Sequence, residues 1–125
     1  MAGGTACGKT TLCKKIYDAI GKQISFVSFD SFYISLTEEQ RLNAQNYNFD
    51  DPKALNKDEA LECLKKLLRG EDCSVPVYDF SRHQRKSESE NVLIKARPVI
   101  IFEGIFALYH QEFRDIMDLK IFVLA

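Results

Sequence analysis

The hydrophobic residues near the N-terminus recur with the period of a helix. Leu12, Ile16 and Ile20 follow one another every four positions, which places them on one face of a helix over Lys9–Ile20. Gly21 is suited to end that helix. The first predicted element is therefore an amphipathic helix that directly follows a glycine-rich N-terminus.

Two further helices are predicted from capping patterns. Thr37 followed by Gln40 forms a capping-box sequence, which opens a short helix through about Ala44. Asn56 followed by Glu59 does the same for a longer helix. We expect its apolar stripe to consist of Leu61, Leu64, Leu67 and Leu68. The helix is expected to end at Gly70.

The other apolar runs predict strands, at Ile24–Phe29, Val75–Phe80, Asn91–Lys95, Val99–Phe102 and Leu119–Leu124. Val75–Phe80 is interrupted by Pro76 and is expected to pair with Asn91–Lys95 across the polar loop Ser81–Glu90. Val99–Phe102 is a continuous apolar run, which suits a strand buried on both faces.

The order of these elements predicts the fold class. A last helix is expected over Phe106–Met117, so strands alternate with helices along most of the chain. This alternation is typical of an α/β domain with a mainly parallel sheet. No repeat or linker divides the sequence, and we predict a single domain over residues 1–125.

Composition narrows the class of protein. Hydrophobic residues make up 46% of the chain and charged residues 28%, which argues against disorder. The net charge of -1 provides no basic field for nucleic acid, and no apolar run approaches the length of a membrane span. A signal-peptide pattern is missing, so we expect a cytoplasmic location. The cysteines lack zinc-site or redox spacing and are expected to be free thiols, at Cys7, Cys13, Cys63 and Cys73.

The strongest motif spans Gly3–Thr10 and reads G-G-T-A-C-G-K-T, a complete phosphate-loop pattern. Gly3 and Gly8 permit backbone angles that turn consecutive N–H groups toward phosphates. Lys9 would reach the β- and γ-phosphates, and Thr10 would offer a hydroxyl to Mg²⁺. The predicted nucleotide site contains Gly3, Gly4, Thr5, Ala6, Cys7, Gly8, Lys9, Thr10 and Thr11.

Two acidic residues follow predicted strands. Asp30 ends Ile24–Phe29, where it could accept a proton from an attacking hydroxyl, hold a Mg²⁺-bound water, or simply cap a turn. Glu103 ends Val99–Phe102, where a carboxylate can bind the Mg²⁺ complex, and Gly104 permits a sharp turn after it. The motif and these acids together predict binding of a nucleoside triphosphate with Mg²⁺.

The chain resembles the uridine kinases (uridine-cytidine kinases) of the phosphoribulokinase/uridine kinase group. The matching segments occur in family order and cover nearly the whole chain: G-G-T-A-C-G-K-T-T at Gly3–Thr11, F-D-S-F-Y at Phe29–Tyr33, N-F-D-D-P at Asn48–Pro52, P-V-Y-D-F-S-R-H at Pro76–His83 and F-E-G-I-F-A-L-Y at Phe102–Tyr109. The resemblance implies a phosphate-loop NTPase-like three-layer sandwich with an inserted β-hairpin.

The resemblance also implies an activity, the transfer of a phosphoryl group from ATP or GTP to the 5′-hydroxyl of uridine or cytidine. Asp30 would then be the general base, and Glu103 with Thr10 would serve Mg²⁺. The substrate residues would be Tyr33 at the nucleoside, Asp50 at the ribose hydroxyls, Tyr78 and Phe80 stacking on the base, and His83 hydrogen-bonded to the base edge.

Alternatives remain for several of these side chains. Tyr78 and Phe80 could be packing residues, and His83 could be a solvated surface histidine. Arg82 and Arg85 could steer phosphate, or they could serve solubility in a polar hairpin.

The family pattern is incomplete at both ends of this sequence. The strand that leads into the phosphate loop and the arginine-bearing lid are both missing, so we expect a truncated chain with unpaired strand edges. Such edges are compatible with a homo-oligomer. A non-catalytic nucleotide-binding or regulatory module, and a phosphoribulokinase-like sugar kinase, are the alternative functions. The aromatic residues argue against a sugar phosphate, which has no base to stack.

Overall fold

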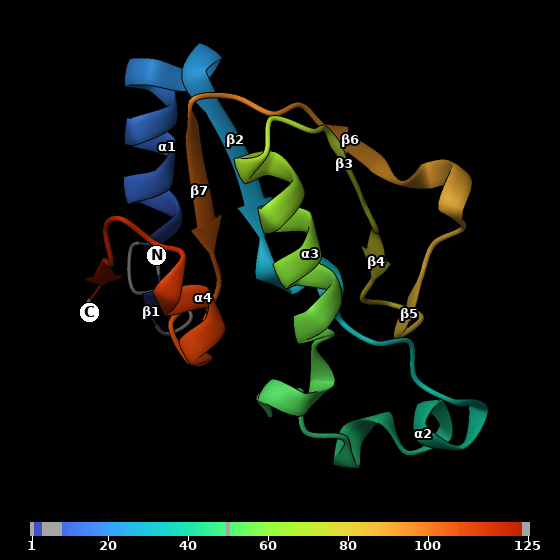
Figure 1. The fold of residues 1–125 in the computed structure, drawn as a ribbon. Helices are drawn as coiled ribbons and strands as arrows, with labels where there is room; N and C mark the ends of the chain where they lie inside the picture. The colour runs from blue at the N-terminus through green and yellow to red at the C-terminus, as the bar shows by residue number, and fades with distance from the viewer. Residues whose placement is uncertain (1, 4–8, 50, 124–125) are drawn as a thin grey trace.

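The computed structural model describes residues 2–3, 9–49 and 51–123. The helices that position the site are α1 (Lys9–Ile20), α2 (Glu38–Leu42), α3 (Lys57–Leu68) and α4 (Gln111–Asp115). The strands are β1 (Ala2–Gly3), β2 (Ile24–Ser28), β3 (Cys73–Val75), β4 (Tyr78–Asp79), β5 (Gln84–Arg85), β6 (Val92–Ile94), β7 (Val99–Glu103) and β8 (Phe122–Val123). Figure 1 shows their arrangement.

A parallel pair, β2 and β7, forms the centre of the fold (Figure 1). Ile24 pairs with Val99 and Ser28 pairs with Glu103, so both strands end at the same edge. This confirms the predicted α/β class with parallel strands and two of the predicted strands to within a residue. The parallel pairing means that residues following β2 and β7 meet at the carboxyl edge.

A second parallel pair joins the two ends of the chain. β1 pairs with β8, and the Ala2 amide donates to the Ile121 carbonyl at 2.9 Å. A two-residue strand therefore leads into the phosphate loop, and its second residue, Gly3, is also the first residue of the motif. β8 is shorter than the predicted Leu119–Leu124, of which Leu124 lies outside the described residues.

An apolar hollow of about 390 Å³ lies beside β7. Its lining includes Ile16 of α1, Leu64 of α3, Met117, and Val99–Ile101. Among the described strands β7 pairs only with β2, and Val99–Ile101 are half-buried. The prediction of a fully buried strand is therefore wrong for these residues, because the edge of β7 away from β2 has no described strand neighbour and the hollow leaves their side chains partly exposed.

The inserted hairpin is antiparallel, but the expected pairing of Val75–Phe80 with Asn91–Lys95 is confirmed only at Val75, because Tyr78–Asp79 pairs with Gln84–Arg85 instead. β3 pairs with β6 from Cys73–Ile94 to Val75–Val92, and β4 pairs with β5 farther out. The segment expected to be a plain loop, Ser81–Glu90, contains β5 and a 3-10 turn at Glu88–Glu90. Tyr78 faces Arg85 across the outer pair, which brings an aromatic and a charged side chain into register.

Both capping predictions are confirmed at the first turn of each helix. Thr37 and Gln40 form the reciprocal capping box of α2. The Asn56 side chain accepts a hydrogen bond from the Glu59 amide at 3.1 Å and so caps α3. These bonds satisfy amides that have no partner inside the helix.

The apolar stripe of α3 differs from the prediction. Its buried residues are Ala60, Cys63, Leu64 and Leu67, whereas Leu61 is half-buried and Leu68 is 56% exposed. Positions 60, 63, 64 and 67 have the spacing of one helix face. The face of α3 that packs against the core includes two small residues, Ala60 and Cys63. The prediction that Leu68 belongs to this face is wrong.

The helix predicted over Phe106–Met117 is also shorter. Turns occupy residues 105–109, with the Ala107 amide bonded to the Gly104 carbonyl at 3.2 Å, and α4 begins only at Gln111. His110, the residue before α4, has an extended backbone, which separates the turns from the helix.

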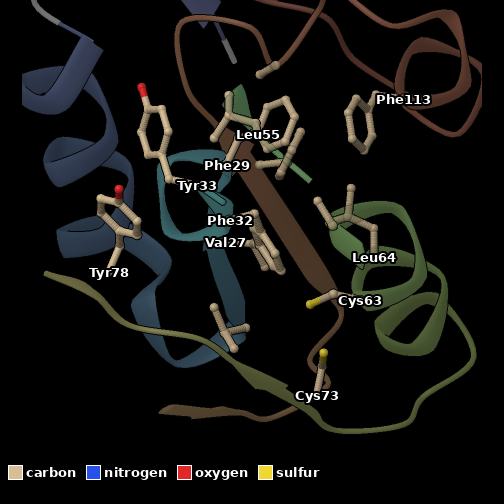
Figure 2. Packing of buried hydrophobic residues seen from close by; sticks show 14 of the residues in the cluster. Val27, Phe29, Phe32, Tyr33, Leu55, Cys63, Leu64, Cys73, Tyr78 and Phe113 are labelled. Atoms are coloured by element: carbon tan, nitrogen blue, oxygen red, sulfur yellow. The ribbon is translucent and has the colours of Figure 1, made fainter. Parts of the chain in front are cut away.

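The aromatic core sits under the carboxyl edge of the β2–β7 pair. Phe29 is 0% exposed, and its ring centroid lies 5.3 Å from that of Phe102 and 5.1 Å from that of Phe113. Figure 2 shows Phe29 and Phe113 in this cluster together with Leu64 of α3. The core therefore fixes the backbone directly before Asp30.

Cys63 of α3 and Cys73 of the hairpin are buried thiols that lie where these two elements pack together. Their sulfur atoms point toward one another in Figure 2, and both are reduced. Burial and the neighbouring Cys73 raise the pKa of the Cys63 thiol well above its usual range. At neutral pH the Cys63 thiol is therefore protonated, which makes it a poor nucleophile.

Candidate functional site

Asp30 and Glu103 lie at the same edge of the sheet. Glu103 ends β7 opposite Ser28, and Asp30 follows two residues later in the 3-10 turn Phe29–Phe32. Both side chains are half-buried. This arrangement brings together the two acidic residues that the sequence predicted at the carboxyl ends of strands.

Gly104 allows the chain to turn sharply after β7. Its φ is +154°, a conformation that residues with a side chain rarely adopt. A Cβ at this position would lie 3.0 Å from the Cβ of Phe29 and 3.8 Å from Oδ1 of Asp30. The missing side chain thus lets the backbone after Glu103 approach the Asp30 carboxylate, as the predicted sharp turn requires.

The phosphate-loop motif leads into α1 from the same end of the molecule. The first turn of α1 lies at the end where β2 and β7 finish (Figure 1). Lys9 and Thr10 begin the helix as predicted, although their side-chain positions are not described, and Thr11 is exposed. The remaining predicted loop residues lie outside the described ranges: Gly4, Thr5, Ala6, Cys7 and Gly8.

An aromatic cluster forms next to Asp30, which we define as Tyr33, Phe49, Tyr78, Phe80 and His83. The Tyr33 ring centroid lies 5.5 Å from that of Tyr78 and 5.8 Å from that of Phe80. His83 stacks on Phe49 with a centroid distance of 5.2 Å. Four side chains that the sequence analysis assigned to the nucleoside are therefore neighbours in space, although they come from separate segments.

Phe49 was missed as a site residue, although it lies within the N-F-D-D-P segment. Asp50, the predicted ribose ligand in that segment, lies outside the described residues. The Asp51 side chain accepts a hydrogen bond from the Lys53 amide at 2.9 Å and caps a short turn. Asp51 therefore has a structural role as a cap, which leaves Asp50 as the candidate ribose ligand of this segment.

A hollow of about 440 Å³ links the acidic edge to the hairpin. Its lining includes Asp30 and Ser31 from the turn after β2, and Tyr78 and Phe80 from the hairpin. The Tyr78 hydroxyl is buried and has no hydrogen-bond partner among the residues described, and burial raises its pKa. The hollow is therefore lined by one carboxylate and by aromatic side chains that include Tyr78 and Phe80.

His83 and the hairpin arginines have distinct environments. His83 has a φ of +55°, and its carbonyl accepts a hydrogen bond from the Leu36 amide at 2.9 Å. The Arg82 side chain is 74% exposed and lies 3.9 Å from Asp79. Arg85 is instead half-buried and bonded to Glu59, so neither of the two roles left open for it, phosphate steering or solubility, fits its contacts.

His110 packs against the core below the acidic edge. Its ring lies 6.3 Å from that of Phe29 and 5.7 Å from that of Phe113, and its Nε2 is buried with no hydrogen-bond partner in the described part of the chain. Burial, with the nearby cations Lys57 and Arg114, lowers the pKa of His110 against the opposing effect of Glu112.

This pKa shift predicts a pH-dependent stability. The folded chain binds the His110 proton less readily than the unfolded chain, whose imidazole has a pKa near 6.5. The contribution of the neutral His110 side chain to the free energy of unfolding is therefore complete above the pKa of the unfolded chain, and it decreases as the pH falls below that pKa. Urea unfolding between pH 7.5 and 5.5 should show falling stability, and H110F should reduce the slope. The neighbouring Y109F serves as a control, and an unchanged slope in H110F would contradict this assignment.

The parallel strand pair and the phosphate-loop sequence that leads into α1 define an α/β protein of the phosphate-loop class. A model of the phosphoribulokinase/uridine kinase family matches residues 1–125. The chain therefore belongs to the phosphoribulokinase/uridine kinase family.

Curated relatives agree with this membership. The chain is 41% identical over 124 residues to the chloroplastic uridine/cytidine kinase UKL1 of Arabidopsis thaliana, covering 98% of this chain and 25% of that protein. It is 38% identical over 133 residues to uridine-cytidine kinase 2-B of Danio rerio, covering 98% of this chain and 50% of that protein. The chain thus spans between a quarter and half of the length of these relatives.

Solved structures share the fold. A protein of Bacillus stearothermophilus described as a possible uridine kinase superposes with a TM-score of 0.70 at 16% identity, covering 97% of this chain and 66% of that chain. D-glycerate 3-kinase of Cryptococcus neoformans gives a TM-score of 0.55 at 21% identity, covering 84% of this chain and 41% of that chain. At these identities the likeness concerns the fold alone. Among the described residues, no helix has the length and hydrophobicity needed to cross a bilayer.

Proposed function

We propose that this chain provides the nucleotide and nucleoside sites of a uridine/cytidine kinase. The reaction would transfer the γ-phosphoryl group of ATP or GTP to the 5′-hydroxyl of a pyrimidine nucleoside, giving UMP or CMP. The observation that carries the proposal is the hollow that Asp30 shares with Tyr78 and Phe80, at the strand edge from which the phosphate-loop helix also starts.

The acceptor half of the site would contain the general base. Asp30 would accept the proton of the 5′-hydroxyl as its oxygen attacks the γ-phosphorus, and the bond to the β-phosphate oxygen would break. The phenol of Tyr78 would donate a hydrogen bond to the bound nucleoside, and the rings of Tyr78 and Phe80 would hold the base. Asp50 and His83 would complete this half, at the ribose hydroxyls and the base edge.

The donor half would bind the triphosphate through the loop of residues 3–11. Backbone amides of the loop and the ammonium of Lys9 would hold the phosphates, with the N-terminus of α1 directed at them. The available donors fit Mg²⁺, since Thr10 and Glu103 are oxygen ligands. No group of three or more metal-binding side chains occurs in the described ranges. Mg²⁺ bound mainly through phosphates would neutralise their charge.

A nucleoside substrate is favoured over a sugar phosphate by the aromatic cluster. Phe80 is 59% exposed, which leaves its ring accessible to a flat partner such as a nucleobase. A sugar phosphate would need cationic groups here, whereas the hollow is lined by aromatic and aliphatic side chains, two serines and one carboxylate. We accordingly propose small-molecule partners, with the cytoplasm as the simplest location for them.

The proposal is tested by adding Mg·ATP and uridine to the 125-residue chain. Calorimetry should detect binding of each ligand, and chromatography should detect UMP and ADP. K9A should remove the heat of nucleotide binding and leave uridine binding in place. Binding without product would favour a non-catalytic module, and a folded chain that binds neither ligand would contradict the proposal.

A second prediction concerns the Tyr78 hydroxyl. Y78F should weaken uridine binding by about 5- to 10-fold, the value of one ordinary hydrogen bond. It should not lower the free energy of unfolding, because the buried hydroxyl has no described partner within the protein. Calorimetry and urea unfolding measure both effects.

Y17F is the matched control, since Tyr17 is 55% exposed on α1. Equal uridine affinity in Y78F and the unchanged chain would rule out the proposed contact.

A further inference from the structure

Arg85 connects three elements around the candidate site. Its Nη1 donates to both carboxylate oxygens of Glu59, at 3.0 and 2.8 Å. Its Nε donates to the Tyr33 carbonyl at 3.0 Å, and Nη2 lies 3.3 Å from the Phe32 carbonyl. One guanidinium thus joins the hairpin, the chain that follows Asp30, and the first turn of α3.

Glu59, the partner of Arg85, is itself held in place. Its Oε2 accepts a hydrogen bond from Nδ2 of Asn56 at 3.2 Å, and Asn56 caps α3 through the Glu59 amide. The Asn56 amide donates to the Phe32 carbonyl at 2.8 Å, so the network returns to a carbonyl that Arg85 also contacts. A closed, charge-assisted network of this kind restricts the position of each member.

Hydrogen bonds of the backbone also connect the hairpin to the segment that follows Asp30. The Arg85 amide donates to Oγ of Ser35 at 2.9 Å, and the Leu36 amide donates to the His83 carbonyl at 2.9 Å. Arg85 is 25% exposed, far less than the 74% of Arg82 on the same hairpin. The hairpin is therefore fastened to the segment 32–36 from both its backbone and this side chain.

The connection lies between the two halves of the acceptor site. Tyr78, which pairs with Arg85 in the hairpin, belongs to the half that would hold the base. Asp30 lies two residues before Phe32 and belongs to the half that would hold the 5′-hydroxyl. The rings of Tyr33 and Tyr78, one from each half, lie 5.5 Å apart and are seen together in Figure 2.

We propose that Arg85 is a positioning residue, which holds the base-binding hairpin at the distance from Asp30 that a whole nucleoside spans. The inference rests on the proposed function and adds the residue that aligns its two halves. Arg85 does not touch the substrate in this assignment. Its guanidinium is required because a lysine ammonium cannot offer the planar set of donors that reaches a carboxylate and two carbonyls at once.

This role predicts a difference between ligands. Uridine must contact both halves, whereas 1-methyluracil, which carries a methyl group in place of the ribose, contacts the base-binding half alone. R85M should therefore weaken uridine binding about 10-fold or more and leave 1-methyluracil binding nearly unchanged. R85K, which keeps the charge, should lose part of the uridine affinity.

The experiment titrates both ligands into the 125-residue chain and follows their proton NMR signals. R82M is the matched control, because Arg82 comes from the same hairpin and its exposed side chain makes one long ion pair, to Asp79, within the described part of the chain. E59Q keeps the shape of the network and removes one charge, so it tests the same contact if R85M does not fold. The expected result is a fall in the ratio of uridine to 1-methyluracil affinity in R85M and E59Q, but not in R82M.

Two results would overturn the inference while the proposed function stands. Equal losses for both ligands would show that Arg85 supports the fold in general, and an unchanged ratio would show that it aligns nothing. Absence of uridine binding by the unchanged chain would instead contradict the proposed function, and this inference with it.

Discussion

D30N is expected to lower the rate of phosphoryl transfer to uridine by about 10²- to 10⁴-fold, the usual contribution of a general base. The amide is nearly the same size as the carboxylate but cannot accept the proton of the 5′-hydroxyl. Mg·ATP binding should be unchanged, because the phosphate-loop residues come from a different segment. Steady-state formation of UMP and calorimetry with Mg·ATP measure the two effects.

The control for this prediction is D18N, which removes an equivalent charge from the exposed face of α1. It should retain full turnover. The assignment of Asp30 as the base would be wrong if D30N kept the rate of the unchanged chain. A fall in nucleotide affinity in D30N would point instead to a role at the Mg²⁺ complex, the alternative that its place at the strand end also allows.

F29A is expected to have the largest effect on stability, about 3–5 kcal/mol. Phe29 is fully buried between Phe102 and Phe113, so alanine would leave a cavity in the aromatic core. A loss of this size approaches the whole stability of many small domains, which is about 5–15 kcal/mol. Urea unfolding followed by circular dichroism should show a much lower midpoint, or no cooperative transition.

L42A is the matched control for F29A. Leu42 is 82% exposed on α2, and its truncation should change the free energy of unfolding by less than about 0.5 kcal/mol. Similar midpoints for F29A and L42A would show that the core around the carboxyl edge does not stabilise the chain. Because Phe29 directly precedes Asp30, F29A should also displace the proposed base, so binding and stability are to be measured together.

Local chemistry explains why much of the chain could be predicted. The limits of α1 and the caps at Thr37 and Asn56 depend on neighbouring residues and backbone amides, and these predictions are confirmed. The parallel pair could be predicted because apolar runs alternate with helices. Asp30 and Glu103 could each be predicted at the carboxyl end of a strand, and the parallel pairing brings those two ends to one edge.

Errors arose where burial depends on a distant partner. Helical spacing permits several faces for α3, and contact with the core chose Ala60 and Cys63 over Leu68. The apolar run of β7 resembles a strand covered on both sides, but its neighbours in space leave part of it beside a hollow. Neither outcome is encoded within the few residues that a local pattern examines.

The sequence alone determined the family, the phosphate-loop motif and the types of side chain at the candidate site, since these reside in contiguous segments. Three features follow only from the packing of remote segments: Phe49 joins the aromatic cluster, the Tyr78 hydroxyl is buried, and Arg85 bonds Glu59 across 26 residues. The physical reason is that contacts between remote segments depend on how the hairpin and α3 pack around the β2–β7 pair.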